Sequence, residues 1–177
     1  MNQPCDAQSH SFTSAASDAC NAAYPSSILT AGTPAPNFAL PVEVGKNVEL
    51  KDFRGRPVVL AFYPADFSPV CGDQLALYNE VIEDFDAYNA QLLGISVDSA
   101  FCHKAYAKSR SLDFPLLADF HPKGQVACLY GVYHQEWGVA QRALFVIDAS
   151  GIIRWSHLAS MDLSPGADGI FAALAKL

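Results

Sequence analysis

The chain has few charged residues and no basic run. Only 16% of its 177 residues are Asp, Glu, Lys or Arg, and 18 acidic residues against 11 basic ones give a formal net charge of -7. A protein of this sign is repelled by the phosphate backbone of nucleic acids and by anionic lipid surfaces. The composition therefore predicts neither a nucleic-acid partner nor a membrane partner.

Long apolar runs and regular cysteine spacing are also missing. No run approaches the roughly 20 consecutive apolar residues of a transmembrane helix. Residues 1–24 contain no Lys or Arg and no apolar centre, unlike a secretory signal peptide. The five cysteines are irregularly spaced, unlike a secreted disulfide framework. Together these absences favour a cytoplasmic protein.

Pairs of residues at metal-ligand spacing are absent as well. The sequence contains neither Cys-x-x-Cys nor His-x-x-x-His. The side chains of Cys102 and His103, which are neighbours, would diverge on a helix. We therefore expect no metal site.

The sequence does contain enough apolar material for one packed domain, because 51% of its residues are hydrophobic. Residues 1–33 are rich in Ser, Ala and Asn and show no sustained period, which predicts a flexible or loosely docked N-terminal extension. The domain itself is expected over residues 34–177.

Apolar runs alternate with helical patterns through this domain. Two runs, at 57–63 and 91–97, flank a helical pattern at 68–88. Because both runs are continuously apolar, they are typical of parallel strands covered on both faces. The second half predicts helices at 99–110, 124–130 and 165–177, a strand at 116–118, and a hairpin of strands 142–148 and 152–156. We expect an α/β domain with a central sheet between helices.

One segment, from Pro64 to Gln74, has the residues for chemistry. Ser68 followed by Pro69 is typical of a helix start, with Ser at the N-cap and Pro in the first helical position. Cys71 then lies in the first turn, where unpaired backbone N–H groups and the helix dipole favour a thiolate over a thiol.

The helix start alone is too weak to ionise the thiol. Lowering a thiol pKa from about 8.5 to about 6 takes roughly 3.4 kcal/mol, whereas a helix terminus supplies about 0.3–1 kcal/mol. A cation must supply the remainder. Arg142, at the start of a predicted buried strand, is the candidate. Desolvating a guanidinium there is costly, which favours a role for it in an active site.

The pattern Pro64-x-x-x-Ser68-x-x-Cys71 resembles the active-site signature of the peroxiredoxins, thiol peroxidases of thioredoxin fold, with Ser in place of the usual Thr. The similarity covers about residues 33–177 and includes the segments Ala35–Leu40, Gly94–Asp98 and Arg142–Asp148 in the family's order. It implies a thioredoxin-like α/β fold with a central mixed sheet flanked by helices.

The resemblance also implies a role for each residue of the motif. Cys71 would attack the peroxide as a thiolate and become a sulfenic acid. Ser68 would hydrogen-bond the thiolate and the peroxide, Pro64 would shield the sulfur, and Arg142 would hold the thiolate and polarise the O–O bond. This chemistry requires no cofactor. The substrate would be hydrogen peroxide, with alkyl hydroperoxides as a further class.

The thiol that resolves the sulfenic acid is left open. Cys102 is one candidate, because Ser99 is placed to cap its helix and the first turn would favour its thiolate too. A one-cysteine cycle with an external thiol is the other. Ala76 excludes a resolving cysteine five positions after Cys71. Cys128 lies in an apolar helical stretch and is expected in the core. Cys5 and Cys20 remain open.

The resemblance further implies recycling by thioredoxin, glutaredoxin or a low-molecular-weight thiol, and a homodimer. Two other functions are weighed against it. A thiol-based redox sensor or interaction module would use oxidation of Cys71 only to change a partner's affinity. A thioredoxin-type disulfide oxidoreductase would need a second cysteine in the same turn, where Ser68 and Gln74 stand instead.

Overall fold

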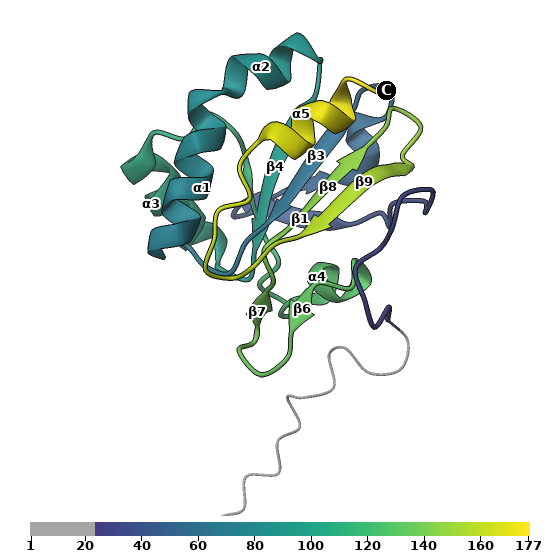
Figure 1. The fold of residues 1–177 in the computed structure, drawn as a ribbon. Coiled ribbons are helices and arrows are strands. Elements are labelled where there is room, and N and C mark those ends of the chain that lie inside the picture. Colours follow the sequence, from purple (N-terminus) through teal and green to yellow (C-terminus); the bar gives the residue numbers. More distant parts are fainter. Residues whose placement is uncertain (1–23) are drawn as a thin grey trace, which may run out of the picture.

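The computed structural model describes residues 24–177 and is built around a five-stranded mixed sheet in the order β5-β4-β3-β8-β9 (Figure 1). The strands are β3 (Val58–Phe62), β4 (Gln91–Ser96), β5 (Leu116–Ala118), β8 (Ala143–Ile147) and β9 (Ile153–Leu158). The first three are parallel, and β8 is antiparallel to both β3 and β9. The predicted parallel strands and the predicted hairpin are therefore confirmed.

The two faces of this sheet carry separate apolar clusters. One face is covered by α1 (Pro69–Glu80), α2 (Ile82–Ala87) and α5 (Asp168–Leu174), and α3 (Ala100–Arg110) runs beside β5. The other face is covered by β1 (Ala39–Glu43), β2 (Lys46–Glu49), the 3-10 turn η1 (Leu50–Phe53) and α4 (Gln125–Leu129). Every residue of β3 and of β8 is buried, which explains why their sequences are continuously apolar.

The predicted helix over 68–88 is divided in two. The α-helix ends at Val81, whose φ of -105° and ψ of 24° leave the helical region, and α2 starts at the next residue. The β-branched pair Val81 and Ile82 has low helix propensity. The apolar period does not reveal the break, because Tyr78 and Phe85 on either side of it reach the same cluster, with ring centroids 6.3 Å apart.

Two short antiparallel pairs were not predicted. These are the β1–β2 hairpin and the pair β6 (Tyr133–His134) with β7 (Val139–Ala140). The residues of β2, β6 and β7 are mostly exposed or half-buried, so their sequences lack the apolar run that marks the central strands.

Residues just before the predicted domain boundary at residue 34 dock on the domain. Ile28 and Leu29 pack on the apolar cluster of the sheet, the Leu29 amide donates to the Tyr130 carbonyl at 3.2 Å, and the Gly32 amide donates to the Ile153 carbonyl at 2.8 Å. An isolated apolar pair gives no period, so sequence reasoning could not assign it to the core. The rest of the predicted extension, residues 1–23 with Cys5 and Cys20, lies outside the described residues.

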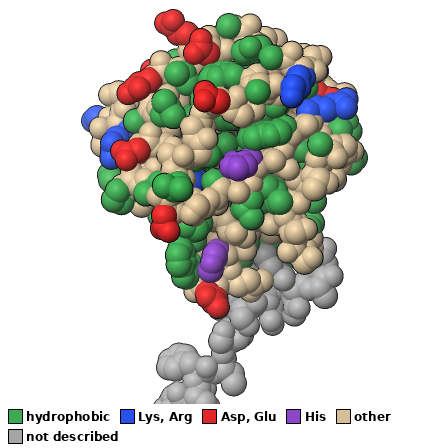
Figure 2. All heavy atoms as spheres, in the orientation of Figure 1, with side chains coloured by type: hydrophobic (Ala, Val, Ile, Leu, Met, Phe, Trp, Pro, Cys, Tyr) green, Lys and Arg blue, Asp and Glu red, His purple; other side chains and the backbone are tan. Residues whose placement is uncertain are grey.

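The surface agrees with the low charge of the sequence. Figure 2 shows a face on which charged side chains are few, with hydrophobic and neutral polar atoms between them. Within residues 24–177, no helix is both long enough and apolar enough to cross a bilayer.

The aromatic centre of the sheet gives a test of this packing. Phe145 is fully buried and meets the rings of Phe62 and Tyr130 at centroid distances of 5.8 and 5.1 Å. Phe145→Ala should lower the free energy of unfolding by about 3–5 kcal/mol, because it leaves a cavity. Leu163, which is 68% exposed, is the control, and Leu163→Ala should change stability by less than about 0.5 kcal/mol. Denaturant unfolding followed by circular dichroism measures both, and equal effects would contradict the packing.

Candidate active site

The candidate site begins where β3 ends. The chain leaves the sheet after Phe62, forms a short loop and enters α1 with Ser68 at the N-cap and Pro69 in the first helical position, as predicted. Cys71 is the third residue of this helix, within the first turn, whose amide groups lack intrahelical partners. The Ser68 side chain makes no capping hydrogen bond. Its hydroxyl is therefore not committed to holding the helix end.

Arg142 is brought to Cys71 by strand pairing. It directly precedes β8, whose first residue Ala143 is paired with Phe62, the last residue of β3. The strand end that leads into the loop of Cys71 thus lies beside the strand start that carries Arg142. Both side chains are buried, with exposed fractions of 0% and 1%, and Arg142 Nη2 lies 3.5 Å from Cys71 Sγ.

A chain of hydrogen bonds fixes the guanidinium of Arg142. Its Nη1 donates to Gln74 Oε1, and its Nη2 donates to the Met161 carbonyl at 3.0 Å. The Gln74 amide nitrogen donates to the Tyr78 hydroxyl at 3.1 Å, and that hydroxyl donates to the Gly166 carbonyl at 3.2 Å. Burial raises the pKa of Tyr78 to about 12, so the hydroxyl stays a donor.

Gln74 was not predicted as a site residue. Sequence reasoning used it only as the position where a second cysteine is missing. The available signal was a polar side chain three residues after Cys71, on the same face of a helix whose other inward residues are apolar. A fully buried glutamine needs partners for its amide, and the Arg142 guanidinium is one of them.

The charge on Arg142 has no carboxylate partner in the part of the chain that the structure describes. Its hydrogen-bond acceptors there are an amide oxygen, a backbone carbonyl and the Cys71 sulfur. A buried guanidinium without an anion is costly. Cys71 is the one of these acceptors that can become an anion, so the guanidinium is placed to stabilise negative charge on its sulfur. The Arg142 Nε also lacks an acceptor among these residues and remains an available donor.

Pro64 is half-buried in the loop between Tyr63 and Ser68. Its predicted role in shielding the sulfur stays a prediction, as does the role of Ser68 in binding the peroxide.

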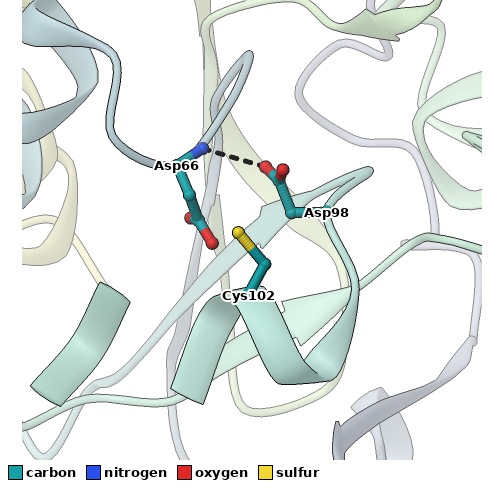
Figure 3. A group of neighbouring side chains, drawn as sticks. All are labelled: Asp66, Asp98 and Cys102. Carbon is teal, nitrogen blue, oxygen red and sulfur yellow. Dashed lines mark hydrogen bonds between the residues drawn. The ribbon is translucent and has the colours of Figure 1, made fainter. Parts of the chain in front are cut away.

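Cys102 lies in a different environment from the predicted one. Ser99 caps α3 as expected and accepts a hydrogen bond from the Cys102 amide at 3.3 Å. The thiol, however, lies beside the carboxylates of Asp66 and Asp98, with the three ligand atoms within 4.8 Å of one another (Figure 3). The pKa of Cys102 is raised to about 12. Burial is the largest cause, and hydrogen bonding to Asp66 and the negative charge of Asp66 come next. Burial and these two carboxylates therefore oppose the Cys102 thiolate that the helix start was expected to favour.

The same three residues have the atom types of a metal site, but their carboxylates are already engaged. Asp66 accepts from the Tyr63 hydroxyl at 2.7 Å and contacts His103 Nδ1 at 2.9 Å. Asp98 accepts from the Asp66 amide at 2.9 Å and from the Ser96 hydroxyl at 2.7 Å. This cluster is accordingly a hydrogen-bonded network in which protein donors occupy the carboxylates.

Cys128 is 1% exposed, so its predicted place in the core is confirmed. It is disulfide-bonded and is not a reactive thiol. Cys71 and Cys102 are the free cysteines within residues 24–177.

Comparison with known sequences identifies the family of this chain. The sequence model of the AhpC/TSA family matches residues 31–156. Alkyl hydroperoxide reductase E of Mycobacterium tuberculosis is 36% identical over 132 residues, which cover 74% of this chain and 86% of that protein. Peroxiredoxin-2 of Cricetulus griseus is 41% identical over 133 residues, covering 70% of this chain and 66% of that protein.

Solved structures show the same fold. Peroxidoxin BcpB of Mycobacterium tuberculosis superimposes with a TM-score of 0.75 at 30% identity, covering 84% of this chain and 98% of that one. AhpC of Enterococcus faecalis gives a TM-score of 0.75 at 28% identity, covering 84% and 92%. The thioredoxin-like α/β fold that the motif implied is confirmed by these neighbours, and the chain belongs to the AhpC/TSA family, the peroxiredoxins.

Proposed function

We propose that this thiol-dependent peroxidase reduces hydrogen peroxide by direct attack of the Cys71 thiolate. The observation that carries the proposal is the contact of 3.5 Å between Arg142 Nη2 and Cys71 Sγ inside the protein. A fixed guanidinium there stabilises the anion before the reaction and the oxyanion that leaves during it.

The reaction balances with groups of this site and a thiol from outside. The sulfur of Cys71 gives an electron pair to one peroxide oxygen, so that an S–O bond forms as the O–O bond breaks. The leaving oxygen takes up a proton and departs as water, or as an alcohol from an alkyl hydroperoxide. Cys71 is left as a sulfenic acid. A thiol then displaces water from it to form a disulfide, which a further thiol reduces.

The burial of Cys71 favours a small substrate. Its exposed fraction is 0%, so the loop must open for any oxidant to reach the sulfur, and a compact oxidant requires the smallest opening. Hydrogen peroxide fits this requirement, and alkyl hydroperoxides are the second substrate class proposed. The alternative of a thioredoxin-type disulfide oxidoreductase loses support, because Gln74 at the place of a second cysteine is engaged with Arg142.

The external thiol route is the cycle we propose after the first step. A resolving cysteine attacks as a thiolate, and the raised pKa of Cys102, about 12, opposes this. Thioredoxin, glutaredoxin or a low-molecular-weight thiol would then reduce Cys71 directly. A cycle resolved by Cys102 is the competing proposal.

We further propose a homodimer formed at the carboxyl edge of the parallel strands. Phe67, Phe101 and Phe120 follow β3, β4 and β5 respectively, and they are 58%, 74% and 56% exposed. Parallel strands end at the same edge of a sheet, so these exposed rings share one side of the molecule. A cytoplasmic location also stays a proposal, which the disulfide of Cys128 does not favour.

The first prediction concerns the nucleophile. Cys71→Ser should abolish peroxide consumption, because a serine hydroxyl does not ionise at neutral pH. Cys102→Ser, which removes the other free thiol of the described residues, should retain oxidation of Cys71. Peroxide consumption with dithiothreitol as reductant distinguishes the two variants. Turnover by Cys71→Ser would contradict the assignment.

A second prediction concerns the guanidinium. Arg142→Met should reduce the thiolate absorbance of Cys71 at neutral pH and slow its oxidation on the order of 100-fold, because a preorganised cation is lost. Gln74→Leu keeps the charge but removes one acceptor from Arg142, and about tenfold slowing is expected. Stopped-flow oxidation measures both. Unchanged rates in both variants would remove Arg142 from the mechanism.

A third prediction separates the two cycles. Peptide mapping of the peroxide-treated protein, with no reductant present, should find Cys71 as a sulfenic acid that a carbon nucleophile traps. A Cys71–Cys102 disulfide as the main product in the unchanged protein would instead establish Cys102 as the resolving thiol.

Asp98→Asn should lower the pKa of Cys102, because it removes one of the two neighbouring negative charges.

A further inference from the structure

We propose that Asp66 and His103 are positioning residues, which hold the loop 63–68 against α3 and thereby keep Cys71 beside Arg142. This inference rests on the peroxidase mechanism proposed for Cys71. It concerns a contact that neither the motif nor the reaction itself requires.

Both the main chain and the side chain of Asp66 make hydrogen bonds that fix its position. Its amide donates to Asp98 Oδ2 at 2.9 Å, and Asp98 is itself held at the end of β4 by the Ser96 hydroxyl. Its carboxylate accepts from the Tyr63 hydroxyl at 2.7 Å and contacts His103 Nδ1 at 2.9 Å. A single residue thus fixes the loop to the end of β4 and to α3, and links it to Tyr63 at the start of the loop.

The pair is inaccessible to water. The side chains of His103 and Asp66 are 2% and 0% exposed. His103 Nε2 has no partner among residues 24–177, so the imidazole proton belongs on Nδ1, where the Asp66 carboxylate accepts it. Burial and the charge of Asp66 hold the pKa of Tyr63 well above its usual value, and its hydroxyl remains a second donor. A carboxylate buried to this degree depends on these donors.

The next residue shows why the loop needs to be held. Phe67 has a φ of 59°, in the left-handed region that an aromatic residue rarely adopts, and such strain persists only where surrounding contacts impose it. Its ring packs on Tyr106 at a centroid distance of 4.9 Å. His103 and Tyr106 are three residues apart on α3 and so share one face. The same face of α3 therefore contacts both Asp66 and the strained Phe67.

The position of this loop sets the position of the sulfur. Asp66 lies two residues before the N-cap Ser68 and five before Cys71. A shift of the loop moves the first turn of α1 relative to Arg142, which belongs to a different element. A misplacement of about 1 Å in a reacting group can cost on the order of 100-fold in rate.

Three variants test the proposal. His103→Leu removes the donor to Asp66, whereas His103→Asn keeps an N–H donor near the position of Nδ1. Ile153→Ala is the stability control, since it removes buried apolar volume where β9 pairs with Ile147, at the end of β8 opposite to Arg142. For each, the rate of Cys71 oxidation by hydrogen peroxide, the thiolate absorbance at neutral pH and the unfolding midpoint are measured.

His103→Leu should oxidise at least about tenfold more slowly and lose thiolate absorbance, because the sulfur moves away from Arg142. His103→Asn should stay within about threefold of the unchanged protein. Ile153→Ala should keep its rate although its unfolding midpoint falls.

An unchanged rate in His103→Leu would overturn the proposal, and so would equal slowing in Ile153→Ala. Slowing in both His103 variants would assign the effect to the volume of the ring and overturn the role of the hydrogen bond. An unchanged protein that does not react with peroxide would contradict the proposed function itself, which is a separate result.

Discussion

The positively charged guanidinium of Arg142 is buried at one end of the central sheet, and the groups around it must provide hydrogen-bond acceptors for it. The groups that accept its hydrogen bonds are Gln74, the Met161 carbonyl and the Cys71 sulfur, and of these only the sulfur can become an anion. The guanidinium is therefore placed to stabilise negative charge on the sulfur. The start of α1 adds a weaker contribution of the same sign.

The topology of the sheet makes this contact possible. The chain separates Cys71 from Arg142 by a parallel β-α-β unit and much of the second half of the domain, yet the antiparallel pairing of β3 with β8 brings the end of one strand to the start of the other. Gln74 extends the arrangement along α1, since it lies one turn after Cys71. The site thus draws on backbone pairing for its placement and on a buried hydrogen-bond chain for its rigidity, which is how a site is preorganised.

The sequence was informative where the signal is local. The order of Ser68, Pro69 and Cys71 predicts a helix start with a cysteine in its first turn, and a charged residue beginning an apolar strand pointed to Arg142. Other features depend on contacts between distant elements. Burial of the Cys102 thiol, together with Asp66 and Asp98 from separate loops, raises its pKa, which is opposite to the effect of its own helix start. The docking of Leu29 on the sheet is likewise decided by tertiary packing, which no local period records. The division of the long helix at Val81 coincides with a pair of low helix propensity, but the apolar period continues through it.

The central claim is that the buried Arg142 guanidinium stabilises negative charge on the reacting Cys71 sulfur. The most direct measurement is the second-order rate constant of Cys71 oxidation by hydrogen peroxide, compared among the unchanged protein, Arg142→Lys and Arg142→Met. We predict that Arg142→Lys, which keeps the positive charge, retains more of the rate than Arg142→Met, which removes it. Equal rates in all three proteins would contradict the account.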